Sequence, residues 1–329
     1  MENRGRSTAD DGQGFQWSPA AGRLDWIDVA RGIGIVAVVA GHVWTRGPLR
    51  DAIYSFHMPL FFLLSGMLAQ PRPVLAFARR QVAGQMRPYA AFLALLIAAD
   101  QIIEPLRGNR PIFHQWPDDL LPILLGGTWL RGPYTIFWFV PCLMVARILF
   151  NAVQARWPDP LDRRWGGVVI AMLALAYALP PWARHVSVLG SLSVPMAFCL
   201  LWAGTAWSRI SWRGWMWVPI LLLSGAALAG LLPTLNMKAG DYGWPLLSIG
   251  AAVATSLLLC RISARIAPAT RILAALGQAS LVVMYLHVAF VHYLRPHMAA
   301  WLLLPVALIV PFGIDRLIRR SAVLRRIFL

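Results

Sequence analysis

The sequence predicts an all-α, polytopic membrane protein with about ten transmembrane helices, and three observations lead to this fold class. Only 13% of the 329 residues are charged and 58% are hydrophobic, whereas an ordinary soluble domain carries about 25% charged residues. The apolar residues form blocks of roughly 20 residues, the length that crosses a bilayer as a helix. Short loops that carry most of the arginines separate these blocks.

Ten apolar blocks are candidate spans: 27–45, 52–69, 88–105, 134–152, 166–183, 188–207, 215–232, 244–260, 276–295 and 299–315. The segment LLPILLGG, 120–127, is too short to cross and is expected to be re-entrant or interfacial. Residues 1–23 are polar and lack the apolar core of a secretory signal, so we expect a flexible cytoplasmic tail. The membrane domain is expected to cover 24–316, and a basic cytoplasmic tail 317–329.

The distribution of basic residues predicts the orientation of these spans. With the N-terminus inside, 21 of the 30 lysines and arginines fall in cytoplasmic segments, eight fall outside, and Arg31 lies within the first span. Such an excess on the cytoplasmic side is typical of inner loops. An even number of spans then leaves both termini in the cytoplasm.

Composition also argues against two other classes of protein. The net charge of +16 is spread over many loops, and Lys238 is the only lysine. A nucleic-acid-binding protein concentrates basic residues on one surface, so we expect no nucleic-acid partner. The three cysteines, Cys142, Cys199 and Cys260, lie within apolar blocks. Their spacing fits neither a disulfide framework nor a metal site, so we expect buried, inert thiols.

Two ionisable residues interrupt the first apolar block, DVARGIGIVAVVAGHV. Arg31 and His42 are eleven residues apart, a rotation of roughly 1100°, or three turns plus 20°, so both project from one helix face about 16 Å apart along the axis. Asp28 precedes Arg31 by one turn and can pair with it. Taken singly, either residue is interpreted equally well as structural. Their shared face favours a cavity or a protein partner, because ionisable groups avoid lipid.

Polar residues in other spans are further candidates. His57 enters the second span from outside at a depth similar to that of His42, where it would bind a ligand or fix the tautomer of His42. A histidine that only packs beside Pro59 is an equally good interpretation. Asp100 and Glu104 close the third span at its outer end and are expected to be interfacial. A proton-coupled carrier usually needs a carboxylate in mid-membrane, and none is found there.

Four segments together resemble the integral-membrane acyltransferase-3 family, especially its fucose 4-O-acetylase-like branch. They are LDWIDVARGIGIVAVVAGHV, FHMPLFFLLSGML, IFWFV and LGQASLVVMYLH, in this order along 24–316. The resemblance implies a multi-pass enzyme of the bacterial inner membrane that moves an acyl group, most often acetyl from acetyl-CoA, to a sugar hydroxyl. Typical acceptors are cell-surface or exported glycans, such as lipopolysaccharide and exopolysaccharide, including lipid-linked sugars.

The resemblance also implies roles for individual residues. The arginine, ten residues and a histidine that form the family signature correspond to Arg31 and His42. We expect Arg31 to face the phosphates of acetyl-CoA. His42 would act as general base on the acceptor hydroxyl or accept the acetyl group transiently. Tyr285 or His287 would donate a hydrogen bond to the oxyanion. Supporting or substrate-binding residues would be Asp28, His57, Ser65, Trp138, Ser280, Tyr285 and His287.

No metal or permanently bound cofactor is expected; acetyl-CoA would be a substrate. Expected partners are the lipid bilayer, the glycan acceptor, and polysaccharide-synthesis machinery or a second copy of the chain. Two alternatives stay open. The face with Arg31 and His42 could line the path of a transporter or exporter for a small anion or a lipid-linked glycan. The same fold could also transfer succinyl or another acyl group.

Overall fold

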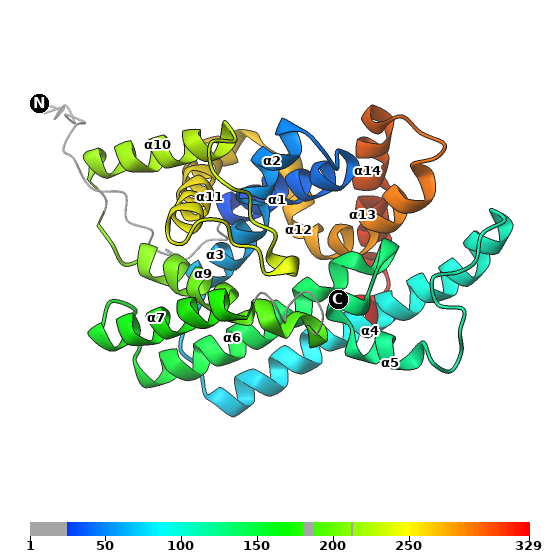
Figure 1. The fold of residues 1–329 in the computed structure, drawn as a ribbon, viewed down its shortest axis with the longest axis horizontal. Coiled ribbons are helices and arrows are strands. Elements are labelled where there is room, and N and C mark those ends of the chain that lie inside the picture. Colours follow the sequence, from blue (N-terminus) through cyan, green and yellow to red (C-terminus); the bar gives the residue numbers. More distant parts are fainter. Residues whose placement is uncertain (1–24, 180–186, 212) are drawn as a thin grey trace, which may run out of the picture.

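The computed structural model describes residues 25–179, 187–211 and 213–329, so the predicted tail 1–23 lies outside the described residues (Figure 1). These ranges contain helices and no strand; Asn236 and Asp241 form an isolated bridge. The α-helices are α1 Asp25–Val43, α2 Pro48–Tyr54, α3 His57–Met67, α4 Val74–Leu106, α5 Leu120–Leu125, α6 Phe139–Arg156, α7 Arg163–Ala178, α9 Val194–Trp207, α10 Trp217–Leu228, α11 Leu247–Ile266, α12 Arg271–Gln278, α13 Ser280–Leu294, α14 Ala300–Arg320 and α15 Ala322–Phe328. Short 3-10 helices are η1 Gly127–Trp129, η2 Gly132–Trp138, η3 Val188–Ser193, η4 Gly214–Met216, η5 Met237–Ala239 and η6 Ala267–Ala269.

The prediction of a helical, multi-pass membrane protein is confirmed, and the number of spans is resolved in part. Six helices of the described ranges are long and apolar enough to cross a membrane, and the bent pair α12 and α13 would make a seventh. The predicted span 52–69 is divided into α2 and α3 at Ser55 and Phe56, and 215–232 contains a shorter apolar helix. The total of ten spans and the orientation of the termini stay predictions.

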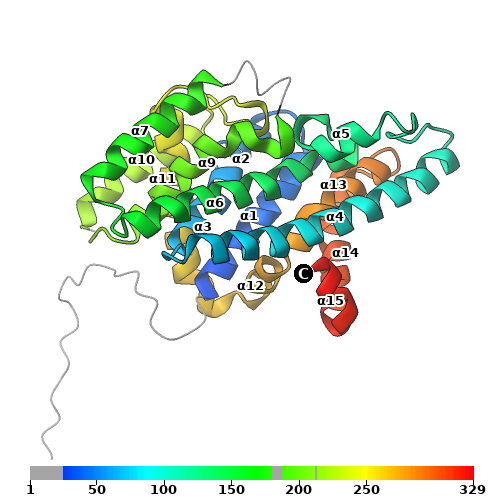
Figure 2. The ribbon, with the colours of Figure 1, turned by 90° about the horizontal axis from the view of Figure 1, so that it is seen from below.

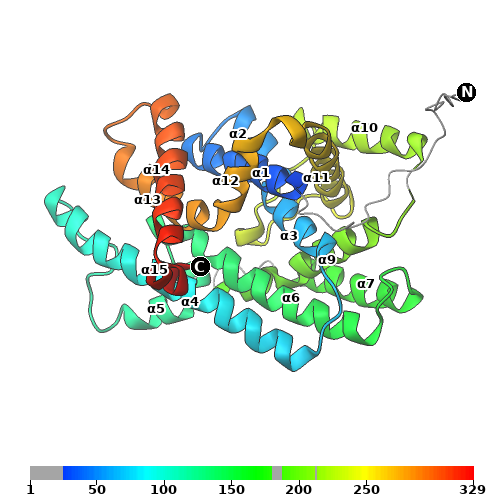
Figure 3. The same cartoon turned by 180° about the vertical axis from the view of Figure 1, so that it is seen from behind.

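Helix α3, which begins at His57, lies at the centre of the bundle and contacts α1, α9 and α11 (Figure 1; Figure 3, from behind). It crosses α9 closely because a Cβ atom on Gly66 would collide with the carbonyl group of Leu201. A Cβ atom on Gly204 would likewise collide with the carbonyl group of Leu63. Small residues allow such backbone approach in membranes. The hydroxyl of Thr205 donates to the Gly66 carbonyl at 2.7 Å and completes the contact.

The first turn of α1 is anchored by α12 and α14. Gly277 of α12 lies against the backbone of Asp28, and the Gln278 side-chain amide donates to the Asp28 carboxylate at 3.1 Å. Arg319 of α14 donates to the Gln278 carbonyl at 2.9 Å and pairs with the buried Asp315 at 2.7 Å. Asp28 is therefore part of a network that sets the position of α1, in addition to its contact with Arg31.

Asp100 and Glu104 are buried within the protein, with exposed fractions of 0% and 3%, and their interfacial depth in the membrane stays a prediction. The Asp100 carboxylate accepts hydrogen bonds from the Tyr293 hydroxyl at 2.6 Å and from the Ile112 amide at 2.8 Å. Glu104 pairs with Arg107 at 2.7 Å. The loop that follows α4 and the helix α13 fold against this end of α4. These partners compensate the cost of burying the carboxylates.

The C-terminal segment packs against the bundle. Residues 317–320 continue α14, and α15 then contacts α4 (Figure 3). The ring of Phe328 lies 4.9 Å from that of Phe92, which is stacked on Tyr285.

One side of the bundle is covered by irregular segments: 120–138, 187–193 and 230–246. Figure 2 shows α2 and α5 near one edge of the molecule, and α12 and α15 at the opposite edge. The Thr128 amide donates to the Ser187 carbonyl, and the Ser193 hydroxyl donates to the Met237 carbonyl at 2.8 Å. Non-helical backbone at membrane depth occurs only where protein buries it or where it lines a cavity. The helix α5, with six residues, is too short to cross, as expected for 120–127.

Candidate functional site

A cavity of about 250 Å³ lies at the C-terminal end of α1, beneath the irregular segments. It brings together His42 of α1, His57 of α3 and Trp138 of η2, which the sequence places in three separate predicted spans. The cavity is lined by His42, Tyr54, His57, Met58, Thr135, Ile136, Trp138, Leu235, Asn236, Met237 and Lys238. The expectation that His42 and His57 lie at similar depth agrees with this arrangement.

The hydrogen bonds of His42 assign its tautomer. Its Nδ1 lies 2.9 Å from the carbonyl oxygen of Val38, an acceptor, so Nδ1 carries the proton. In a neutral imidazole the other nitrogen, Nε2, then has a free lone pair. Within the described residues, Nε2 has no hydrogen-bond partner. The cavity therefore holds an imidazole nitrogen that is able to accept a proton or to act as a nucleophile.

His287 of α13 supports this tautomer. Its Nδ1 is 2.9 Å from the carbonyl oxygens of Val283 and Met284 and must donate, so its Nε2 is an acceptor. That Nε2 lies 3.4 Å from Nδ1 of His42, and the two rings meet edge to face at 4.9 Å. The sequence suggested His57 for fixing the tautomer, but the Nδ1 atom of His57 donates to the Ile53 carbonyl at 3.0 Å. The side chain that is hydrogen-bonded to the His42 ring is that of His287.

Lys238 and Thr135 were not identified from the sequence. The Lys238 ammonium donates to the carbonyls of Leu130 and Thr135 at 3.0 and 3.1 Å and to the Thr135 hydroxyl at 2.6 Å. Burial lowers the pKa of Lys238 to about 8. The Thr135 hydroxyl oxygen accepts the hydrogen bond from Lys238, so the hydroxyl proton of Thr135 is free to be donated. No acceptor for that proton is found in the described ranges. The available signal was that Lys238 is the only lysine among 30 basic residues.

A second cavity, of about 110 Å³, lies beside the ends of α3 and α6 that are distant from His42. It contains Ser65, one of the predicted residues, and three arginines: Arg72, Arg80 and Arg147. Arg147 and Arg31 are close enough to repel each other electrostatically. Arg31 also lies 3.6 Å from Asp28. Near this end of α1, Arg31 therefore lies close to a second guanidinium group, that of Arg147, which the sequence alone did not single out.

Ser280 and Tyr285, like the predicted residues Asp28, Arg31 and His287, line neither cavity. Ser280 begins α13 at the 79° bend that follows α12. Tyr285 is fully buried, with its ring 4.8 Å from Phe92 and 5.0 Å from Phe137. Its hydroxyl has no hydrogen-bond partner in the described part of the chain. In this conformation the hydroxyl groups and cations beside His42 come from Thr135, Tyr54 and Lys238.

The sequence model of the acyltransferase domain matches residues 24–314, which include all elements that line the two cavities. The chain belongs to the acyltransferase-3 family. The resemblance of the four sequence segments to this family is thereby confirmed, whereas the branch stays a prediction, and the protein is a membrane acyltransferase. No curated protein and no solved structure matches the chain significantly.

Proposed function

We propose that this acyltransferase moves an acetyl group from acetyl-CoA to a sugar hydroxyl of a cell-surface or exported glycan in the bacterial inner membrane. The observation that carries the proposal is the free Nε2 of His42 in a cavity, with Nδ1 held by Val38 and His287. A histidine in this state is suited to general-base catalysis. We further propose the predicted topology of ten spans, with both termini in the cytoplasm.

In the proposed reaction, Nε2 of His42 removes the proton of the sugar hydroxyl while that oxygen attacks the thioester carbonyl. The new C–O bond forms, the C–S bond breaks, and the CoA thiolate leaves and takes up the proton. The charge that develops on His42 is stabilised through its Nδ1–H, which points to the Val38 carbonyl and to His287. A direct transfer predicts no exchange of label between acetyl-CoA and free CoA when the acceptor is absent. Exchange would indicate an acetylated His42 instead.

The donor would enter from the end of α1 that carries Arg31. Guanidinium groups bind phosphates in bidentate fashion, and the second cavity presents Arg72, Arg80 and Arg147, of which Arg147 lies close to Arg31. Arg31 and His42 are about 16 Å apart along α1, a distance that the extended pantetheine arm of CoA must span. The charged part of acetyl-CoA would thus bind at the cytoplasmic end, and its thioester would reach His42.

The Thr135 hydroxyl would bind the oxyanion of the tetrahedral intermediate. Its oxygen accepts a bond from Lys238 at 2.6 Å, which polarises its O–H toward the cavity. Donors of this kind stabilise the transition state when they are held in place before the reaction. We assign this role to Thr135 because it lines the same cavity as His42, whereas Tyr285 does not. His287 acts through His42 and is a positioning residue.

Acetyl transfer by the purified protein tests the proposal. In detergent, radiolabelled acetyl-CoA and de-acetylated surface glycan from the host should yield acetylated glycan, and His42→Ala should abolish the product while the protein still inserts. His114→Ala is a matched control, because His114 is exposed outside both cavities. Normal product from the His42 variant would contradict the assignment. A transporter has no two compartments to connect in detergent and would give no product. Supplying succinyl-CoA tests the alternative acyl group.

A further inference from the structure

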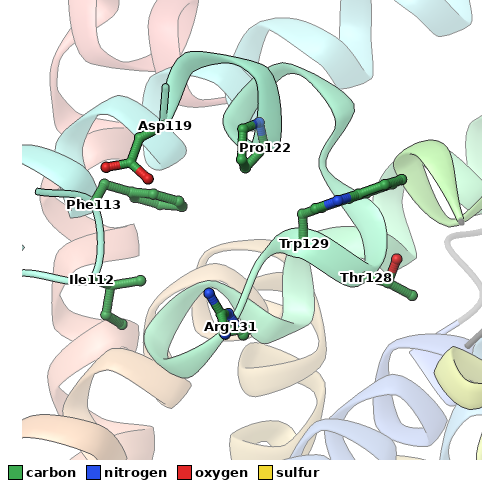
Figure 4. A pocket seen from close by; sticks show the side chains of 7 residues that line it. All are labelled: Ile112, Phe113, Asp119, Pro122, Thr128, Trp129 and Arg131. Atoms are coloured by element: carbon green, nitrogen blue, oxygen red, sulfur yellow. The ribbon is translucent and has the colours of Figure 1, made fainter. Parts of the chain in front are cut away.

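A third cavity, of about 320 Å³, lies outside both sites described above (Figure 4). It is built by the loop that follows α4, by α5, and by η1 with the turn that leads to η2. Its apolar lining comes from Phe113, Pro122 and Trp129, and Figure 4 shows Asp119 and Arg131 on opposite sides of it. The volume falls in the range of small-molecule sites.

The two charged side chains are available to a ligand. Arg131 is exposed, and no ion pair in the described ranges involves it. The Asp119 carboxylate accepts one hydrogen bond, at 2.6 Å, from the Gln115 amide. An indole ring beside a free guanidinium group and a carboxylate suits a sugar ring, whose apolar face packs on the aromatic group and whose hydroxyls bind the charged groups.

This cavity is connected to the His42 cavity by one stretch of chain. Trp129 and Arg131 line this third cavity, which we call the outer cavity. Thr135 and Trp138 line the cavity of His42. Lys238 fastens this stretch at Leu130 and Thr135. Six residues lead from 129 to 135 and span at most ~20 Å, and the turns of η2 shorten this distance. A short oligosaccharide is long enough to occupy both cavities at once.

We infer that the acceptor is a glycan chain of at least two sugar residues, and that another sugar of the same chain binds in the outer cavity against Trp129 while one sugar is acetylated beside His42. This inference rests on the proposed function, because it takes the acceptor to be a sugar. It adds that a single sugar leaves the outer cavity empty and is a poor acceptor.

Protection of an introduced cysteine tests the binding site without relying on activity. The three native cysteines are buried, so a membrane-impermeant maleimide should label Ile112→Cys at the cavity and Arg110→Cys, an exposed control two residues earlier. The probes are methyl glycosides of fucose, rhamnose, galactose and glucose and the matching di- and trisaccharides. We expect trisaccharides of at least one sugar to slow the labelling of Ile112→Cys at concentrations about tenfold lower than the monosaccharide, with no effect on Arg110→Cys.

Failure of protection by every sugar would overturn the inference, and protection by inorganic phosphate instead would identify a lipid-phosphate site and overturn it too.

Acetylation kinetics give the second measurement. Trp129→Ala should raise KM for the protecting trisaccharide about tenfold and leave KM for the monosaccharide unchanged, whereas Trp116→Ala, exposed on the same side outside the cavity, should change neither. Equal effects of Trp129→Ala on both acceptors would contradict the inference. If sugars protect but no acetyl group is transferred, the proposed function fails while the binding site stands.

Discussion

The Nε2 atom of His287 lies 3.4 Å from the Nδ1 atom of His42, although 245 residues separate them in the sequence. His287 uses its own Nδ1 on the carbonyls of its helix, so the nitrogen that faces His42 is an acceptor. The pair directs the lone pair of His42 Nε2 into the cavity. The contact joins α1 to α13.

Loss of this contact should slow the chemical step. His287→Leu is expected to lower kcat about 100-fold, the lower end of the range for general acid-base catalysis, with KM for acetyl-CoA unchanged. His287→Gln should retain more activity, because its amide oxygen can accept a hydrogen bond near the position of Nε2. Steady-state kinetics on both variants, with membrane insertion as control, check this. Equal activity of the Leu and Gln variants would remove the positioning role.

Deprotonation of Lys238 should lower kcat at alkaline pH. Burial lowers the pKa of Lys238 to about 8, so its ammonium is present below pH 8 and is lost as the pH rises through that value. Once neutral, it no longer polarises Thr135, and kcat should fall above pH 8. Lys238→Arg keeps a positive charge at all these pH values and should remove this limb, at a lower maximal rate. A pH–rate profile with an unchanged alkaline limb in Lys238→Arg would contradict the assignment.

Catalysis is expected to depend on the hydroxyl group of Thr135 and not on the volume of its side chain. Thr135→Val retains the shape but loses the O–H donor and the acceptor for Lys238, so kcat should fall about 100-fold, as for the loss of an oxyanion donor. Thr135→Ser preserves the hydroxyl and should stay within a few-fold of the parent protein. Rates measured at saturating acetyl-CoA distinguish these outcomes, and similar rates for Val and Ser would exclude the hydroxyl from the reaction.

Arg147 should act on the donor and not on the acceptor. Arg147→Gln removes one guanidinium group from the cavity near Arg31 and is expected to raise KM for acetyl-CoA about tenfold, the equivalent of one lost charge-assisted contact. KM for the glycan should be unchanged. Arg209→Gln is the matched control, because Arg209 is exposed outside this cavity. An effect on the glycan KM alone would place the donor elsewhere.

The α3–α9 crossing should be sensitive to a single methyl group. Gly66→Ala places a Cβ atom against the carbonyl group of Leu201, and overpacking of this kind costs about 1–3 kcal/mol. Gly84→Ala in α4 has no heavy atom within 4 Å and should be neutral. The apparent melting temperature in detergent measures the difference, and equal values for the two variants would contradict the close crossing.

The sequence predicted the outline of the site because its main signals are local. Arg31 and His42 share a face by helical periodicity, and Arg31 pairs with Asp28 one turn away. His57 and Trp138 were expected to be functional from segments that resemble the family, and both line the cavity of His42. Periodicity and resemblance do not depend on how distant helices pack.

The sequence by itself determined that the chain is a helical membrane protein of the acyltransferase-3 family, because apolar length and short motifs are properties of neighbouring residues. Only the tertiary structure decided that His287 is hydrogen-bonded to His42, that Lys238 reaches Thr135, and that Asp100 is buried against Tyr293. These contacts link residues more than 100 positions apart. They arise from the packing of α13 against α1 and α4 and from the irregular segments that hold Thr135 and Lys238, and no local pattern specifies this packing.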